Sequence, residues 1–561
     1  MGAEIATIDN RKIMTYRTGD GRLFRLGSLY YDNYYEKIWA KARLSTFRHG
    51  KYLVFGLGSG SFLRELLSQA DEDAVIIVYE PDDSIYGIAA SEFGAEELLS
   101  DKRIIFSRQC SYDKLLSIMS SSVHFADTKG CSICIHPNYP ALFPDQLKMF
   151  RSCAGDCALK NSMIAGTAQE IGARVINNIF RNLKVFNKNQ SIEQLKTVVP
   201  TGIPLVLIAS GPSLDASIDV LKRMKGKAFL LSVDSALPTL MKHDIIPDIF
   251  ISVDPVKELG NFTDERTAAI PGIFPFSCNN RIFEFHRAPA FFYSNSDPIT
   301  DYLAYKKGAS IPRLSAESSV SNHAFDAGVY LGFKNIIFIG LDLGYPGGMA
   351  HSKDALLGGG ITDANDIIVE TACTSGGTVS TNAQMDIYRK LLEESISSHP
   401  DINVINTSRN GALIKGSIYM SPDDAADKFC TDEFSLNFSD FTAAGYNLRE
   451  FFTEVTDSQN SFRRRLRAVL DRIKSLNPAT MEQGTGTDLI PACDSLYQAI
   501  GSRPDLVCIA TAAMENNIDI QKNLYEKTDA GETLKKYIKY FSSILDACDY
   551  VINLEKELFL Q

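Results

Sequence analysis

The sequence predicts an α/β protein with two Rossmann-like domains built on parallel sheets, followed by a helical C-terminal domain. Unbroken apolar runs, which are typical of buried parallel strands, alternate with helical segments over most of the chain. Between Leu534 and Ile552, apolar residues recur with helical spacing instead. We therefore expect an N-terminal domain at residues 1–165, a central domain at 166–425 and a helical domain at 426–561.

A glycine-rich loop marks the N-terminal α/β region. The predicted strand Tyr52–Phe55 runs into Gly56-Leu-Gly-Ser-Gly60, and the next predicted strand ends at Glu80. This pattern is typical of nucleotide or S-adenosylmethionine sites, in which Glu80 would bind ribose hydroxyls. Because any Rossmann-like domain needs a tight turn at this point, the pattern leaves open whether the loop binds a ligand.

The central region is organised around a turn between a strand and a helix. The apolar run Leu205–Ala209 leads into Ser210-Gly-Pro-Ser-Leu-Asp215. Gly211 permits backbone geometries that are closed to other residues, and Pro212 suits the first position of a helix. Ser213 or Asp215 can cap that helix. The turn would direct free N–H groups at one point and so predicts a phosphate cradle, with an ordinary strand-to-helix connection as the alternative.

Polar residues follow several predicted strands of the central region. Asp234 and Ser235 follow the strand Ala228–Val233, Asp254 follows Ile249–Val253, and Asp342 follows Asn335–Gly340. The carboxyl ends of parallel strands meet at one edge of the sheet, where open α/β sheets bind their ligands. Together with the turn at Ser210, these residues predict a ligand site at that edge.

Composition narrows the class of function. The net charge of −11 argues against a general role in binding nucleic acid, which needs a basic surface. The contents of 45% hydrophobic and 22% charged residues are ordinary for a globular protein. No apolar run is long enough to span a membrane, and the first residues lack the pattern of a secretory signal. We expect a cytoplasmic protein.

Eleven cysteines, an odd number without a regular framework, fit reduced thiols in such a compartment. Cys131 and Cys134, followed by Cys153 and Cys157, loosely imitate the spacing of a zinc site. Residues three apart on a strand point to opposite faces, however, so buried core cysteines are the expectation and no metal site is predicted.

Five motifs of the central region carry a resemblance to a known family. They are Ser210-Gly-Pro-Ser-Leu-Asp215, Ser232-Val-Asp-Ser235, Pro247-Asp-Ile-Phe-Ile-Ser-Val-Asp-Pro255, Gly340-Leu-Asp-Leu-Gly-Tyr345 and Asn406-Thr-Ser-Arg-Asn-Gly-Ala412. With these motifs the chain resembles the motility-associated factor (Maf) family of flagellin glycosyltransferases. The central domain is also similar to bacterial CMP-sialic-acid sialyltransferases and to MptE-like 6-hydroxymethylpterin diphosphokinases.

The resemblance implies an enzyme that moves a nonulosonic acid, of the pseudaminic or legionaminic type, from its CMP donor to Ser or Thr of flagellin before export. It implies no tightly bound cofactor; Mg²⁺ is possible but not required. The partners would be flagellin and the nucleotide sugar, with the oligomeric state left open. Donor contacts are implied for Ser210, Gly211, Pro212, Ser213, Leu214, Asp234, Ser235, Asp254, Ser318, Ser319 and Tyr345.

The sequence departs from the sialyltransferase pattern at the general base. Where those enzymes place a histidine, this chain has Thr378, whose hydroxyl cannot act as a base near neutral pH. His351, in the loop after Tyr345, and Asp342 are the candidate replacements. The glycine-rich segment Gly344–Gly360 would be able to close over the donor.

Two other classes of function remain open at this stage. A pterin diphosphokinase would use Mg²⁺ held by carboxylates such as Asp234, Asp254 and Asp342. A non-catalytic flagellin-binding motility factor would need no general base, so the missing histidine keeps this alternative.

Overall fold

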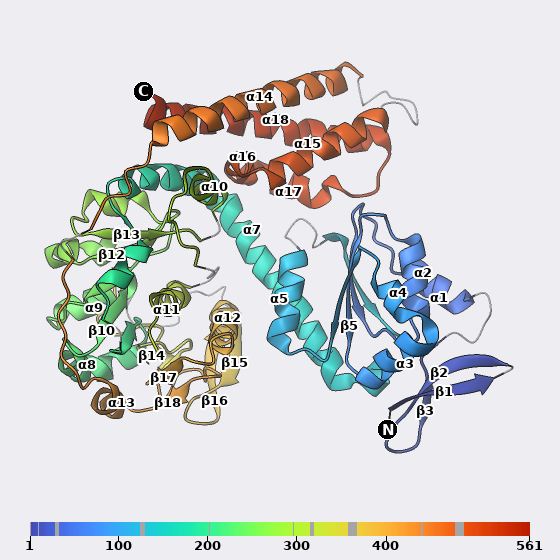
Figure 1. Cartoon of the computed structure of the whole chain (residues 1–561), viewed down its shortest axis with the longest axis horizontal. Coiled ribbons are helices and arrows are strands. Elements are labelled where there is room, and N and C mark those ends of the chain that lie inside the picture. Colours follow the sequence, from blue (N-terminus) through green and yellow to red (C-terminus); the bar gives the residue numbers. More distant parts are fainter. Residues whose placement is uncertain are drawn as a thin grey trace. The chain divides into compact units, whose positions relative to one another are not determined.

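The computed structural model describes residues 2–8, 10–27, 33–123, 129–200, 202–257, 259–295, 297–314, 319–356, 367–438, 441–476 and 487–561. Its contacts group the chain into two compact units. The first comprises Met1–Glu170, Leu466–Leu496 and Met514–Ile544, and the second Ile171–Arg465, Tyr497–Ala513 and Leu545–Gln561. The long helix α7 (Pro144–Phe186) and the C-terminal helices contribute residues to both units (Figure 1). The predicted boundaries at residues 165 and 425 stay predictions.

The first unit contains a parallel sheet in the order β6–β5–β4–β7. Its strands are β4 (Lys51–Phe55), β5 (Val75–Glu80), β6 (Ile104–Arg108) and β7 (Cys131–Ile135). Its helices include α1 (Tyr34–Lys41), α2 (Ser61–Gln69), α3 (Asp83–Phe93), α4 (Ala95–Leu99), α5 (Tyr112–Ser122) and α6 (Tyr139–Leu142). An antiparallel sheet precedes them, formed by β1 (Gly2–Ile8), β2 (Arg11–Arg17) and β3 (Leu23–Arg25).

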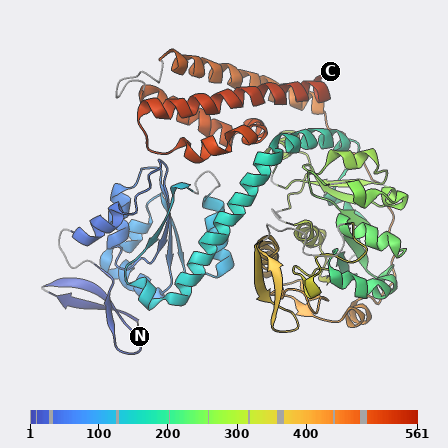
Figure 2. The same cartoon turned by 180° about the vertical axis from the view of Figure 1, so that it is seen from behind.

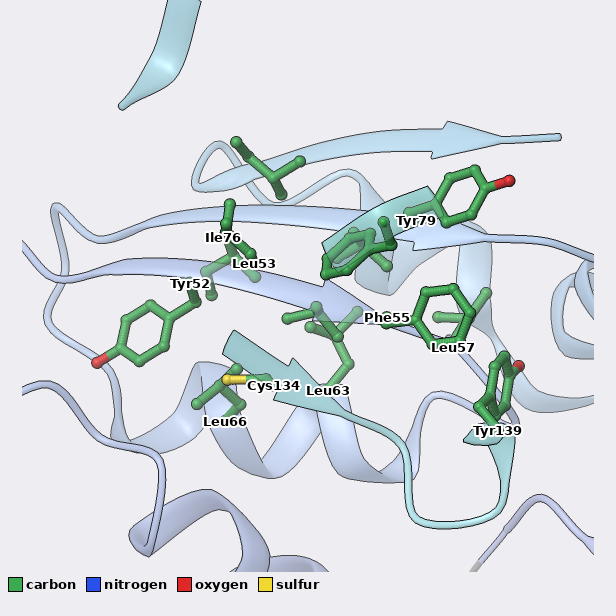
Figure 3. Packing of buried hydrophobic residues seen from close by; sticks show 14 of the residues in the cluster. Tyr52, Leu53, Phe55, Leu57, Leu63, Leu66, Ile76, Tyr79, Cys134 and Tyr139 are labelled. Carbon is green, nitrogen blue, oxygen red and sulfur yellow. The ribbon is translucent and has the colours of Figure 1, made fainter. Parts of the chain in front are cut away.

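The core of the first unit forms because β4 and β5 are apolar on both faces. Figure 3 shows side chains of these strands packed with Leu63 and Leu66 of α2. Such continuous apolar runs are typical of strands covered on both sides. Cys134, Cys153 and Cys157 are buried free thiols in this core, which confirms the prediction for these three, whereas Cys131 is partly buried and packs against the core.

The glycine-rich loop of the first unit is closed by its own neighbours. Glu80 is fully buried, and its carboxylate accepts hydrogen bonds from the Leu57 N–H at 2.9 Å and from the Tyr139 hydroxyl at 2.5 Å. The Gly58 N–H donates to the same hydroxyl at 2.9 Å. A Cβ at Gly56 would lie 2.5 Å from the Tyr139 ring, so the ring rests directly on the loop. Glu80 is therefore engaged within the protein, which favours the alternative of an ordinary tight turn over a ribose contact.

The second unit contains a nine-stranded parallel sheet in the order β18–β17–β14–β9–β10–β11–β12–β13–β8. Its strands are β8 (Gln190–Ser191), β9 (Leu205–Ile208), β10 (Phe229–Val233), β11 (Ile249–Ile251), β12 (Gly272–Pro275), β13 (Ala290–Tyr293), β14 (Asn335–Ile339), β17 (Asn403–Asn406) and β18 (Ile418–Tyr419). A separate hairpin pairs β15 (Ile368–Ala372) with β16 (Thr378–Asn382).

Helices α8 (Ile218–Met224), α9 (Leu237–Lys242), α10 (Pro298–Lys307), α11 (Val320–Leu331), α12 (Ala383–Ser397) and α13 (Pro422–Phe429) accompany this sheet (Figures 1 and 2). Helix α11 packs on β9, β10 and β11. A Cβ at Gly328 of α11 would lie 2.4 Å from Leu205, so the small residue is what permits this close approach.

The chain ends in helices, as predicted: α14 (Leu448–Ser475), α15 (Ile490–Ser502), α16 (Pro504–Ala512), α17 (Met514–Leu524) and α18 (Ala530–Glu555). The apolar stripe of α18 is buried, with Leu534, Phe541 and Ile552 at 1% exposure or less. Among the described helices, none is both long and apolar enough to cross a membrane. The predicted fold class, parallel α/β regions followed by helices, is confirmed.

The buried Glu80 predicts a pH dependence of stability for the first unit. Burial raises the pKa of Glu80 from 4.5 to about 7, so between these values the folded carboxyl binds a proton that the unfolded chain has lost. Stability should fall as pH rises through this window, by at most about 1.4 kcal/mol per pH unit. Urea titrations at several pH values, followed by fluorescence of Trp39, measure this; Trp39 is the chain's single tryptophan and is buried in the same unit.

The Glu80→Gln variant provides the comparison. Groups other than residue 80 contribute equally to both proteins, so the variant should show a flatter dependence on pH. Identical slopes in the two proteins would contradict the raised pKa.

Candidate functional site

The candidate site begins where β9, β10, β11 and β14 end at one level. Ile208 of β9 pairs with Ser232 of β10 on one side and with Ile339 of β14 on the other. Ser232 pairs in turn with Phe250 of β11. Residues that follow these strands therefore emerge along one edge of the sheet, as the sequence predicted.

Two glycines allow the ends of β9 and β14 to touch. The Gly211 N–H donates to the Gly340 carbonyl at 2.8 Å. A Cβ at Gly211 would lie 2.4 Å from Asp342 Oδ2, and a Cβ at Gly340 would lie 2.2 Å from the Ala209 carbonyl oxygen. Gly340 also has a φ of +73°. Any side chain at either position would push the two strand ends apart.

Asp342 joins three chain segments at this contact. Its side chain is 3% exposed and accepts hydrogen bonds from the Ser213 N–H at 2.9 Å and from the Ser408 hydroxyl. Its backbone carbonyl accepts from the Ala412 N–H at 2.8 Å. Burial raises the pKa of Asp342, while the bonds from Ser213 and Ser408 act in the opposite direction. Asp342 thus fixes the turns after β9 and β17 against the end of β14.

The turn Ser210–Leu214 after β9, called here the β9 turn, differs from the predicted phosphate cradle. The Gly211, Ser213 and Leu214 amides donate to Gly340, Asp342 and Gly211, respectively, and Pro212 has no N–H. The Leu214 side chain is fully buried. The prediction of free amides at these positions is therefore wrong. The chain forms a 3₁₀ helix at Pro212–Ser217, which accounts for the bond from Leu214 to Gly211, while the end of β14 accepts the other two.

A large cavity of about 830 Å³ opens beside the β9 turn. Its lining includes predicted residues from three places: Pro212 and Ser213 on the β9 turn, Asp342 and Tyr345 after β14, and Thr378 at the start of β16. Charged and polar lining also comes from Arg409 and Asn410, which follow β17, and from Glu370 of β15. The hairpin β15–β16 thus forms a wall of the cavity that the sequence pattern did not reveal.

A small cavity of about 240 Å³ is lined by three other predicted residues. Ser235, Asp254 and His351 line it, together with Lys257 and Asn261. Ser210 Oγ lies 2.9 Å from Ser235 Oγ and 3.3 Å from His351 Nδ1. The β9 turn therefore contributes Ser210 to the side-chain cluster of the small cavity and Ser213 to the wall of the large one.

Of the two predicted bases, His351 belongs to this cluster. Burial, and then the positive charge of Lys257, lower the pKa of His351 below its ordinary value, so the imidazole is neutral at neutral pH. The adjacent Ser352 N–H donates to the Ser210 carbonyl at 2.8 Å. The loop that carries His351 is thereby attached to the β9 turn.

Asp234 has a different place from the one predicted. It is 1% exposed, and its carboxylate accepts from the Ser252 hydroxyl at 2.6 Å and lies 3.3 Å from Lys257 Nζ. It lines neither cavity among the described residues. The predicted contact of Asp234 with the donor is therefore not supported; its carboxylate instead holds Lys257 at the small cavity.

One further predicted residue lies outside both described cavities. Ser319 caps α11, since its hydroxyl accepts from the Asn322 N–H, and it lines neither described cavity. Ser318 lies outside the described residues. Thr378 is exposed in the large cavity and, as expected of a hydroxyl, supplies no base.

Sequence reasoning missed Lys257, Glu370 and Arg409. Lys257 follows Asp254 by three residues, and Arg409 stands within the quoted Asn406–Ala412 motif, so a search for cations near strand ends would have found both. Within the parts of the chain that the structure describes, no group of three or more His, Cys, Asp or Glu side chains is placed to hold a metal ion.

Comparisons with known proteins agree with this architecture. A family model described as 6-hydroxymethylpterin diphosphokinase MptE-like matches residues 177–348. The structure of the Maf glycosyltransferase from Magnetospirillum magneticum AMB-1 superposes with a TM-score of 0.58 at 15% identity, covering all of this chain and 92% of that one. At this identity the likeness concerns the fold. The predicted resemblance, Maf-like with an MptE-like central domain, is confirmed.

A sequence relative adds less. An uncharacterized protein of Treponema pallidum (strain Nichols) is 36% identical over 85 residues, which cover 15% of this chain and only 14% of that protein.

The contact between β9 and β14 yields a prediction for Gly211→Ala. The added methyl group would overlap the Asp342 carboxylate and the Gly340 carbonyl, at 2.4 and 2.5 Å, so the second unit should lose about 1–3 kcal/mol of stability. Calorimetric unfolding measures the loss. Gly501→Ala is the matched control, because Gly501 lies in α15 of the same unit with no atom within 4 Å of its Cβ position. Equal stability of both variants would contradict the tight contact.

Proposed function

We propose that this protein is a glycosyltransferase that moves a nonulosonic acid, of the pseudaminic or legionaminic type, from its CMP donor to Ser or Thr hydroxyls of flagellin. The reaction would take place in the cytoplasm before export, with no tightly bound cofactor. One observation carries the proposal. Strand-end residues of the Maf-like motifs line two adjacent cavities at one sheet edge, in a fold that matches a Maf glycosyltransferase along the whole chain.

In this proposal the large cavity receives the nucleotide sugar. Its volume of about 830 Å³ lies within the usual range for sites that enclose a small organic ligand. Ser213, Tyr345 and Thr378 offer hydroxyl groups to the phosphate and sugar. Asp342, whose carboxylate is engaged by Ser213 and Ser408, holds these walls together rather than reacting.

The acceptor hydroxyl would enter from the small cavity, where His351 acts as general base. As the bond between the sugar and CMP breaks, the phosphate leaves with the bonding electrons and the anomeric carbon gains oxocarbenium character. The acceptor oxygen then forms the new bond, and its proton passes to the neutral imidazole. Ser210, 3.3 Å from His351 Nδ1, positions the ring so that the other nitrogen faces the acceptor.

A second candidate is the transfer of diphosphate from ATP, and the match to the MptE-like family model over residues 177–348 favours it. That reaction needs Mg²⁺ to neutralise the phosphates. All three carboxylates proposed for the metal are already engaged: Asp234 by Ser252 and Lys257, Asp254 by the Val256 N–H, and Asp342 by Ser213 and Ser408. These carboxylates therefore serve as hydrogen-bond acceptors within the protein and are poorly suited to bind Mg²⁺.

Calorimetric titration with CMP, CDP and ATP, each with and without Mg²⁺, separates these candidates. The proposal expects CMP binding that does not depend on Mg²⁺, followed by transfer of the sugar to purified flagellin from its CMP donor. ATP binding that requires Mg²⁺ would instead support the diphosphokinase and reject the glycosyltransferase. Flagellin binding without affinity for any of the nucleotides would instead support a non-catalytic factor.

The role of His351 predicts a separation of catalysis from binding. His351→Ala should lower kcat for transfer to flagellin by roughly 100- to 10,000-fold, the usual contribution of a general base. CMP affinity, measured by calorimetry, should change little because the large cavity is intact. A variant with normal kcat would show that another group accepts the proton.

The lowered pKa of His351 predicts the pH profile. The base must be neutral, so kcat/KM should fall only when pH drops below its lowered pKa, and the acidic limb should lie below about 6.5, the ordinary pKa of histidine. Lys257→Met removes a positive charge that lowers this pKa, so the limb should move to higher pH. Lys257→Arg keeps the charge, so the acidic limb should stay at the same pH. An acidic limb at the same pH in Lys257→Met and wild type would contradict the assignment.

A further inference from the structure

Charge is unevenly distributed in the large cavity. Two acids, Asp342 and Glu370, line it, and Arg409 is the single Lys or Arg among its described lining residues. The Arg409 side chain is exposed, and the described part of the chain supplies no hydrogen-bond or ion-pair partner for its guanidinium. An unpaired cation beside two acids is suited to an anionic group of the ligand.

The backbone on either side of Arg409 is held firmly. The Ser408 hydroxyl donates to Asp342, and the Gly411 N–H donates back to Ser408 Oγ at 3.1 Å. A Cβ at Gly411 would lie 2.7 Å from the Asp342 carbonyl oxygen, so this turn rests directly on the end of β14. The Thr407 hydroxyl donates to the Phe338 carbonyl at 2.7 Å. Arg409 therefore projects from a fixed turn and can bind with little ordering of the backbone.

We infer that Arg409 binds the carboxylate of the sugar in the donor, an inference that rests on the proposed function. A nonulosonic acid carries this carboxylate on its anomeric carbon, next to the phosphate of CMP. In a cavity with two acids, such a donor would be repelled unless a cation met it. The planar guanidinium matches a carboxylate with two parallel hydrogen bonds, so the contact selects acidic over neutral sugars and turns the anomeric carbon toward the acceptor.

Binding measurements on wild type and Arg409→Ala test the inference. The probes are CMP, CMP-pseudaminic acid, CMP-legionaminic acid and the C1 methyl ester of the acid that binds more tightly. Arg409→Ala should lower the affinity for the CMP-linked acid by roughly 10- to 100-fold, as expected for the loss of hydrogen bonds to a charged group. The affinities for CMP and for the methyl ester should not change. Arg409→Lys should recover part of the affinity.

Lys415→Ala is the matched control. It removes a positive charge from the same chain segment outside the large cavity, and the discrimination between acid and ester should persist in it. If Arg409→Ala lowered the affinity for CMP as much as the affinity for the acid, the arginine would bind the phosphate, and the inference would be overturned. Unchanged affinity for the acid would overturn it as well, while the proposed function would stand. Failure of wild type to bind either acid would instead reject the proposed donor.

Discussion

The second unit depends on the contact between the ends of β9 and β14, which the Asp342 carboxylate secures. This buried side chain accepts from the β9 turn and from the turn after β17, so one group positions the walls of the large cavity. Gly211 and Gly340 are required because the two backbones approach too closely for a side chain. Removing Asp342 or one of its hydrogen-bond donors would leave a buried polar group without a partner. The free-energy cost of such a group exceeds the net stabilisation that the hydrogen bond provides.

The chain uses a glycine turn after a parallel strand twice, with opposite results. In the first unit the turn is filled by Tyr139, whose hydroxyl bridges Gly58 and Glu80. In the second unit the backbone amides are likewise satisfied internally, but side chains around the turn line open cavities. The motif itself is thus a device for packing a strand end. Ligand binding is decided by what the rest of the chain places opposite it.

Cations are positioned differently in the two cavities. Lys257 pairs with Asp234 and lines the same cavity as His351, and its charge favours the neutral form of the imidazole. Arg409 has no such acid partner in the described structure and faces the space of the large cavity. A fixed charge tunes a neighbouring group, whereas an unpaired one is left to meet a ligand. This difference supports a division of the proposed reaction between donor and acceptor sides.

Sequence alone determined the fold class, the four central strands β9, β10, β11 and β14 and the edge at which their polar residues gather. It could do so because apolar runs and strand-end positions are local properties. Only the tertiary structure decided that Glu80, Asp234 and Leu214 are internal, that the hairpin β15–β16 forms a cavity wall, and that Ser210 meets His351. These outcomes depend on partners as distant as Tyr139 from Glu80 or Ser408 from Asp342. No local pattern records which groups such long-range packing will bring together.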